Sequence, residues 1–407
     1  MHEFSLDQAW SASVSAQPRY VAGILRLEAE EFEARALARE RWPDLSLEAG
    51  GDYGQRARPG EERDQGISAR GEILARVNWN LFESGRAARE RAVALRREGV
   101  RESNAAFDHA FRAEVARTYV SASLALERRE HLLAARREFL EIAEVARRRM
   151  REGVEPGAAR EHLEQAEAAW AARWREADTA AETARLQLAL LADRTEVQPL
   201  PIRLSSVPEA SPGDSPPPAL AALRLQAGER RAQAEAVASG NRWRLDAIGQ
   251  AGPYFSRAFD GRTEEEYYAG LRFSWSPDAS GVQRARALAE TRRARALEAE
   301  EAALKRDLAR RDEEVRGLFR DLSSQAEEWD EAVKGAEATE RAVRLRWREG
   351  VTSWRALLDE RERLLSARLG ELAWRERLAL LLVDYAESAA ALDELPVWIG
   401  QTERILP

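Results

Sequence analysis

Apolar and polar residues alternate with a period of two in the stretch GISARGEILARVNWNLF, which begins at Gly66. The small or apolar positions are Ile67, Ala69, Gly71, Ile73, Ala75, Val77, Trp79 and Leu81. This period predicts a strand over about 66–82 with one apolar face and one polar face. A strand of about 15 residues is long for a soluble domain. An Ala/Arg/Glu pattern typical of a helix then follows from about residue 85.

Three more two-faced strands are predicted by the same alternation, over about 43–55, 242–257 and 264–276. The strands fall into two pairs, and a Gly/Pro/charge-rich loop separates the first two. The first pair is therefore predicted to form a hairpin whose loop is longer than a tight turn. In the second pair a loop at 260–262 separates the two strands.

Long helices are predicted between and after the hairpins. The segment 85–150 contains no proline and would span about 100 Å as one helix. A helix of that length exceeds any single globular core, so it must pack along other helices. Gly153 ends it, and a return helix is predicted over about 158–192.

The order helix, strand, strand, long helix, turn, helix then occurs a second time, and such an internal repeat changes the expected fold. The first repeat covers 1–193 and opens with a helix from Phe4 to about Arg41, with Ser5 as the N-cap candidate and an interruption at Pro18. A Pro-rich connector covers 194–218. The second repeat covers 219–392, with a long helix over about 281–347 and a return helix over about 354–392. An irregular tail covers 393–407.

The two helix reversals share the tetrapeptide REGV, at 151–154 and 348–351. A third REGV lies inside the first long helix at 97–100, so only its place at both reversals is informative.

Composition supports long helices. The chain has 407 residues, 44% hydrophobic and 33% charged, and Ala, Glu, Arg and Leu dominate. The formal net charge of −8 gives no indication of nucleic-acid binding. The absence of cysteine excludes disulfides and thiol chemistry and is compatible with an oxidising compartment.

Membrane and export signals are missing from the sequence. No apolar run approaches the length of about 18 residues that a transmembrane helix needs. The N-terminal MHEFSLDQAW lacks the basic and apolar segments of a signal peptide. We therefore expect either a cytoplasmic protein or the mature form of an exported one with an added start methionine.

Four two-faced strands are too few and too separated in the chain to form a soluble core. One physical solution is a closed barrel shared among subunits, with the apolar face toward lipid and the polar face toward water. Aromatic residues near the strand ends suit a membrane interface. These residues are Trp42, Trp79, Trp243 and Trp275.

The arrangement resembles the TolC-like outer-membrane efflux protein family over about Phe4 to Leu392. The resemblance is carried by the opening FSLDQAW…AQP, by VNWNLFESG at 77–85 and by FSWSPDASG at 273–281. The strongest match is RWREGVTSWRALLDERERLL at 346–365, which is similar to the family's second helical turn and return helix.

The resemblance implies a mainly α-helical fold with a transmembrane β-barrel contribution. Three chains would form a homotrimer with a twelve-stranded barrel in the outer membrane and a helical tunnel across the periplasm. The connector and the tail would lie in an equatorial belt. The protein would be the passive exit duct of a tripartite efflux or type I secretion system, with no cofactor. The exported substrate and the type of pump stay open.

The resemblance also assigns roles to single residues. The turns at Gly153, Val154, Gly350 and Val351 would form a periplasmic tip that meets an adaptor protein coupled to an inner-membrane transporter. Asp359 is a candidate for the acidic ring at the closed tunnel mouth, where three carboxylates around one axis would attract cations and repel one another. A solvated aspartate explains this position equally well.

No enzyme signature is present. The sequence has no phosphate-cradling Gly-rich loop and no HExxH motif. The four histidines lack metal-ligand spacing and are predicted to be solvated; they are His2, His109, His131 and His162. Tryptophans within the helices are expected to pack between helices.

The competing hypothesis is a soluble, elongated coiled-coil scaffold in the cytoplasm. Charge-rich helices and the missing signal peptide favour it. The four amphipathic strands count against it, because a scaffold has no use for paired strands at matching points of two repeats.

Overall fold

The computed structural model describes residues 3–55, 67–153, 159–204, 217–239, 243–256 and 263–400. It divides into two compact units that are built from alternating parts of the chain. Unit 1 comprises Met1–Ala22, Asn104–Ala219 and Leu304–Pro407, and unit 2 comprises Gly23–Ser103 and Leu220–Ala303. The long helices α3 (Arg86–Arg151) and α6 (Val282–Ser324) contribute to both units.

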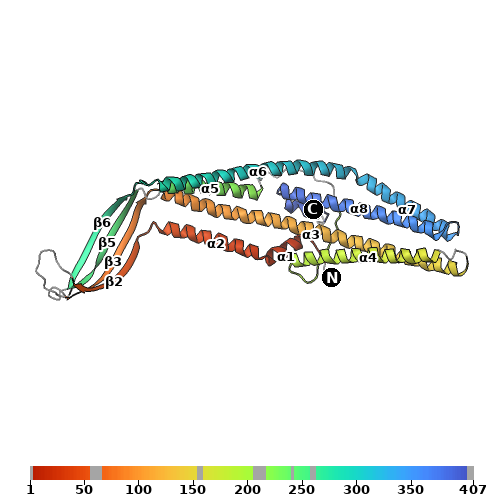
Figure 1. The fold of residues 1–407 in the computed structure, drawn as a ribbon, viewed down its shortest axis with the longest axis horizontal. Helices are drawn as coiled ribbons and strands as arrows, with labels where there is room; N and C mark the ends of the chain where they lie inside the picture. Colours follow the sequence, from red (N-terminus) through yellow and green to blue (C-terminus); the bar gives the residue numbers. More distant parts are fainter. Residues whose placement is uncertain are drawn as a thin grey trace, which may run out of the picture. The chain divides into compact units, whose positions relative to one another are not determined.

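Unit 2 contains a four-stranded antiparallel sheet in the order β2-β3-β5-β6 (Figure 1). Its strands are β2 (Asp44–Gln55), β3 (Ile67–Glu83), β5 (Trp243–Ser256) and β6 (Thr263–Trp275). The two hairpins join through β3 and β5, which pair Arg76 with Gln250. The two predicted pairs of strands therefore lie in one sheet. Strands β2 and β6 are the edges of the sheet.

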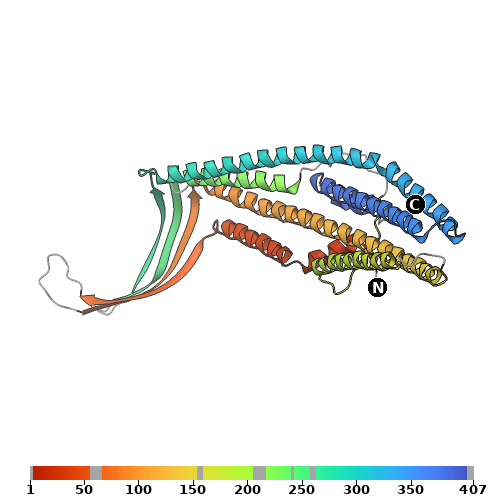
Figure 2. The same cartoon turned by 45° about the vertical axis from the view of Figure 1, so that its right-hand side comes forward.

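Four helices attach to the same end of this sheet (Figure 2). Helix α2 (Pro18–Arg39) leads into β2, and α5 (Pro218–Ser239) leads into β5. Helices α3 and α6 leave β3 and β6. Because neighbouring strands are antiparallel, this order brings all four helix–strand junctions to one end. No helix within the described residues is long and apolar enough to cross a membrane.

Unit 1 is helical apart from one short parallel strand pair. Helix α1 (Leu6–Ala16) begins after Ser5, whose hydroxyl accepts from the Gln8 amide while the Gln8 side chain accepts from the Ser5 amide. This capping box confirms the predicted N-cap. The other elements are β1 (Glu3–Phe4), α4 (Ala159–Leu191), β4 (Gln198–Pro199), α7 (Ala326–Arg348), α8 (Trp354–Ser388), η1 (Leu392–Glu394) and α9 (Leu395–Trp398).

Tyr119 holds the short strand pair onto the core of unit 1. Its hydroxyl donates to the Phe4 carbonyl at 2.7 Å and accepts from the Leu200 amide at 2.8 Å, and its side chain is fully buried. A second buried cluster lies along α3, α4, α7 and α8 and contains Trp170, Trp347 and Trp354. The expectation that the helical tryptophans pack between helices holds for these three.

The predicted helix over about 281–347 is two helices, α6 and α7, separated at Gln325. The indole of Trp374 donates to the Leu322 carbonyl at 2.8 Å. That carbonyl also accepts from the Gln325 amide at 3.2 Å, a bond to the third residue along and not to the fourth as in an α-helix. A side chain that inserts into the ladder is a recognised cause of a helix break.

The tail was predicted to be irregular, and up to Gly400 this is wrong. Helix α9 follows η1, and Leu395 and Ile399 are fully buried in the core of unit 1. Burial of apolar side chains outweighs the weak helical propensity of so short a segment. Residues 401–407 lie outside the described residues.

Gly370 marks a close approach between α7 and α8. A Cβ built at Gly370 would lie 2.4 Å from Cζ3 of Trp329, whereas one at Gly335 on α7 would meet nothing within 4 Å. We expect Gly370→Ala to destabilise the protein by about 1–3 kcal/mol through overpacking. Gly335→Ala should stabilise it by up to about 1 kcal/mol, because alanine favours helix. Thermal unfolding followed by circular dichroism would measure both, and equal effects would contradict the close approach.

Candidate channel residues

One face of the sheet in unit 2 is apolar and exposed. The strand register places Leu45 opposite Val77, Val77 opposite Gly249, and Gly249 opposite Ala269. Adjacent rows follow the same rule, so the apolar positions of all four strands lie on one face. Leu47 is 76% exposed and Leu271 is 70% exposed. The predicted alternation is thus confirmed up to Trp79, but a register shift between Asn80 and Phe82 places Phe82, and not the predicted Leu81, opposite Leu245. The apolar face has no cover within the chain's own described residues.

The opposite face is mainly polar, although it also carries Leu74, which is 2% exposed, and Ile248. Arg76 on β3 donates to Gln250 on β5 at 3.2 Å and forms an ion pair with Glu48 on β2. Arg244 donates to both carboxylate oxygens of Asp246 at 2.9 Å. Charged groups that pair across strands stabilise a water-facing surface. The sheet therefore presents two chemically different surfaces on its two sides.

The four predicted interface tryptophans all lie at the helix-proximal end of the sheet. Trp243 begins β5, Trp275 ends β6, and their rings stack with centroids 5.6 Å apart. Trp79 donates through Nε1 to the Arg41 carbonyl at 2.9 Å. Trp42 is 74% exposed. Trp79, Trp243 and Trp275 therefore lie toward a single end of the apolar face as one aromatic group, and Trp42 lines a hollow beside β2.

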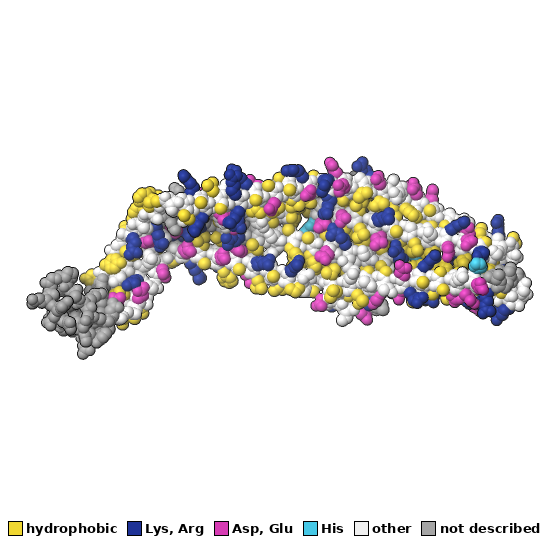
Figure 3. Space-filling model, in the orientation of Figure 1, with side chains coloured by type: hydrophobic (Ala, Val, Ile, Leu, Met, Phe, Trp, Pro, Cys, Tyr) yellow, Lys and Arg dark blue, Asp and Glu magenta, His cyan; other side chains and the backbone are white. Residues whose placement is uncertain are grey.

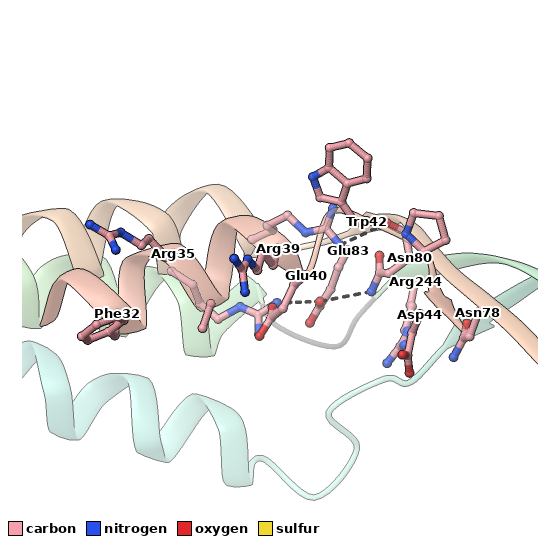
Figure 4. A pocket seen from close by; sticks show the side chains of 14 residues that line it. Phe32, Arg35, Arg39, Glu40, Trp42, Asp44, Asn78, Asn80, Glu83 and Arg244 are labelled. Carbon is pink, nitrogen blue, oxygen red and sulfur yellow. Dashed lines mark hydrogen bonds and ion pairs between the residues drawn. The ribbon is translucent and has the colours of Figure 1, made fainter. Parts of the chain in front are cut away.

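A hollow of about 810 Å³ lies where the helices meet the strands (Figure 4). Glu83 is its central acid, because it accepts from Asn80 at 3.4 Å and pairs with Arg89 at 2.5 Å. The lining also includes Asp44, Asn78 and Arg244, from the polar side of the sheet. This hollow was not predicted from the sequence, since its residues come from three separate stretches of the chain, 32–44, 78–89 and residue 244.

A glycine in the left-handed conformation ends the helix at each of the two reversals. Gly153 has φ +74° and Gly350 has φ +79°, the left-handed conformation that ends a helix at low cost. At the second reversal the Val351 amide donates to the Arg346 carbonyl at 2.8 Å, as in a Schellman motif. Val351 is 71% exposed. Val154 lies outside the described residues.

Asp359 lies on α8, two turns after Ser353, whose hydroxyl accepts from the Ala356 amide at 3.3 Å and caps the helix. The Asp359 side chain is exposed. Within the described residues no cation pairs with it. An exposed, unpaired carboxylate is available to an ion or to a second copy of itself, and it fits the solvated alternative equally.

The sequence reading missed a buried charge cluster that links α3, α7 and α8. Glu340 is 2% exposed and accepts from Arg361 Nε at 2.9 Å and from Arg344 Nη2 at 2.6 Å. Arg361 also pairs with Glu138 on α3. The available signal was position: Glu340 continues the apolar stripe that runs through Val333 and Ala336.

The prediction of solvated histidines is wrong for His109. Its Nε2 atom is buried and has no hydrogen-bond partner, and burial lowers the pKa of its imidazole below the usual range. His131 is half-buried, 3.9 Å from Glu127, and His162 is exposed. His2 lies outside the described residues.

Comparison with solved structures decides the fold. The outer-membrane channel OprN superposes with a TM-score of 0.82 at 19% identity, covering 95% of this chain and 90% of that one. VceC, an outer-membrane protein of Vibrio cholerae, gives 0.80 at 15% identity over 94% of this chain and 95% of VceC. The CmeC outer-membrane channel of Campylobacter jejuni superposes with a TM-score of 0.81 at 12% identity, covering 98% of this chain and 87% of CmeC.

The chain has the fold of the TolC-like outer-membrane channels. The mainly helical architecture with a small sheet is thereby confirmed. No protein-family model matches the sequence, and no curated protein is significantly similar to it. Because the identities are low, the TolC-like fold is recognised here through its geometry: two-faced strands, long helices and glycine reversals.

Proposed function

We propose that the chain is one protomer of an outer-membrane exit duct, a passive conduit for small molecules in a tripartite efflux or type I secretion system. The observation that carries this proposal is the exposed apolar face of the sheet. Moving this apolar surface from water into lipid is favourable through the hydrophobic effect. The polar face on the other side suits a water-filled lumen.

The open edges of the sheet support a closed oligomer. Strands β2 and β6 have no neighbour on their outer sides within the described residues. In lipid, unpaired backbone groups cost several kcal/mol each, so a spanning sheet must close. Pairing β6 of one copy with β2 of the next closes it by rotation, and three copies give a twelve-stranded barrel.

The helical part continues the duct away from the membrane. Helices α2, α3, α5 and α6 leave one end of the sheet, so the barrel of a homotrimer would lead into a helical tunnel across the periplasm. The reversals at Gly153 and Gly350 would meet a periplasmic adaptor protein, which couples the duct to an inner-membrane transporter. The transporter would supply the energy, and this chain would perform no enzymatic step.

The decisive experiment is a measurement of mass and location. The protein is expressed behind an export signal, membranes are separated, and the detergent-solubilised particle is weighed by light scattering after gel filtration. A protein mass of three chains extracted from outer membranes supports the duct. A monomer or dimer that needs no detergent would support the cytoplasmic scaffold, and the exposed apolar face is the observation that disfavours it.

Asp359→Ala tests the proposed gate. If three Asp359 carboxylates ring the closed mouth, their removal should reduce block of the channel by divalent cations in planar bilayers and raise the closed-state conductance. Glu349→Ala is the matched control, since Glu349 is also exposed near the second reversal but lies before Gly350. Unchanged conductance and unchanged block in Asp359→Ala would leave this residue as a solvated aspartate.

A further inference from the structure

The first turns of α6 carry an unusual excess of arginine. Between Val282 and Ala296 the sequence has five arginines and a single acid, Glu290. Glu290 is already used, because it pairs with Arg293 and accepts from Arg230 on α5 at 3.3 Å. The remaining arginines are exposed and have no carboxylate partner within the described residues. They are Arg284, Arg286, Arg292 and Arg295.

Arginines on the neighbouring helices of unit 2 are mostly neutralised. Arg41 pairs with Glu90 at 2.6 Å, and Arg91 pairs with Glu235 at 2.7 Å. Arg231 pairs with Glu298. At the end of α2, the exposed Arg39 is followed directly by the exposed Glu40, so the two charges offset each other. Arg86, at the start of α3, donates to the Asn80 carbonyl at 3.3 Å, and the other arginines of this end that form no ion pair within the described residues and have no adjacent acid lie on α6.

This charge lies directly beside the aromatic group of the sheet. Helix α6 starts seven residues after Trp275, and Figure 3 shows basic side chains over its first part, next to hydrophobic side chains at the end of the sheet. Val282 and Leu288 are exposed apolar residues on the same turns. Tryptophans stacked at the end of an apolar face mark the depth at which lipid headgroups begin.

Asp278, the acid that precedes α6, already has hydrogen-bond donors. The Asp278 carboxylate accepts from the backbone amides of Gln283 and Arg284, at 3.3 and 2.9 Å. It thereby caps the start of α6, and its charge complements the helix dipole. Arg284 and Arg286 are exposed and, among the described residues, neither pairs with an acid; because they are two positions apart, their side chains leave different sides of the helix.

We infer that Arg284 and Arg286 bind the phosphate groups of anionic phospholipids at the helix-proximal rim of the membrane. A guanidinium presents paired donors that match phosphate oxygens, and it is the side chain suited to this contact. Headgroup regions are roughly 5–8 Å thick on each side of the hydrocarbon core. Arg284 and Arg286 lie within about 6 Å of the helix start, whereas Arg292 and Arg295 lie about 15–20 Å along it.

This inference rests on the proposed function, because it needs the apolar face to be in lipid. It adds that the lipid is chosen by charge. Each chain would contribute two arginines at the junction of β6 and α6. Their contacts with anionic lipid would hold the assembled duct at a fixed depth in the membrane. Arg292 and Arg295 lie on the same helix, are likewise exposed, and pair with no carboxylate in the part of the chain that the structure describes. They are therefore matched controls that lie beyond headgroup reach.

The test is lipid binding to the purified full-length oligomer by native mass spectrometry, with phosphatidylglycerol and phosphatidylcholine titrated separately. We expect phosphatidylglycerol to bind more tightly, and Arg284→Gln/Arg286→Gln to weaken it by about 30-fold. Arg292→Gln/Arg295→Gln should leave its affinity within about twofold of the unchanged protein. Millimolar inorganic phosphate should compete weakly, since it lacks acyl chains.

Several results would overturn the inference while leaving the duct intact. One is equal affinity for the two lipids in a protein that still inserts into vesicles and conducts. Another is equal weakening by both double variants, which would indicate a diffuse charge effect. A third is loss of oligomer mass in Arg284→Gln/Arg286→Gln in pure phosphatidylcholine, which would assign these arginines to a neighbouring copy. Failure to insert into any vesicle would instead refute the proposed function itself.

Discussion

Val77→Arg is expected to prevent stable insertion of the protein into membranes, whereas Asn78→Arg is tolerated. The two positions are adjacent on β3 and face opposite sides of the sheet. Arginine on the lipid face near the middle of a barrel costs about 2–4 kcal/mol, and a homotrimer would carry this cost three times. On the polar face, the register places Asn78 opposite Asp44, so an arginine there gains a counter-charge.

Flotation with outer-membrane vesicles and channel conductance measure this difference. Circular dichroism on both variants checks that the helices still form. If Val77→Arg floats and conducts as well as Asn78→Arg, the exposed apolar face does not contact lipid, and the scaffold hypothesis regains its place. Because the two substitutions introduce the same side chain one residue apart, a general effect of added charge cannot produce the expected contrast.

The second large effect is expected at the buried charge cluster of unit 1. Glu340→Ala would remove one of the two carboxylate partners of Arg361, which is 8% exposed, and leave it with Glu138. Removing one partner of a buried pair typically costs about 3–5 kcal/mol, and the remaining contact with Glu138 places the expected loss at the lower end of that range. Lys334→Ala is the control on the same helix. It breaks an exposed pair with Asp330 and should change the stability little.

A double variant separates buried charge from lost packing. Glu340→Leu combined with Arg361→Met removes both charges and keeps apolar volume, so it should lose less stability than Glu340→Ala alone. Denaturant unfolding of the helical signal would measure all three proteins. A Glu340→Ala protein as stable as Lys334→Ala would show that the cluster is solvated.

Much of the fold follows from local pattern. Alternation along β3 predicts a strand with one apolar face, and the register of the sheet bears this out. Ser5 and Pro18 predict where α1 begins and ends, since capping and loss of a donor act within a few residues. The glycine at each reversal is equally local, because φ is a property of one residue.

The remaining features depend on residues far apart in the sequence. The break at Gln325 needs the indole of Trp374, which belongs to α8. The packed tail needs the core of unit 1, which no local pattern reveals. Of the candidate sites, the sequence predicted the tryptophans one by one, but their gathering at one end of the sheet needed the strand order. The roles of Asp359 and the reversals stay predictions.

The pairing of β3 with β5 also sets an order of events in folding. Arg76 and Gln250, which bond across these strands, are 174 residues apart in the chain. Loop-closure entropy makes such contacts slow, while a helix and its return helix can associate locally. Before β5 pairs with β3, the first hairpin therefore has an unpaired edge beside an apolar face. Such edges aggregate readily, so the interval before the second hairpin pairs is the step of folding at which this protein is most prone to aggregate.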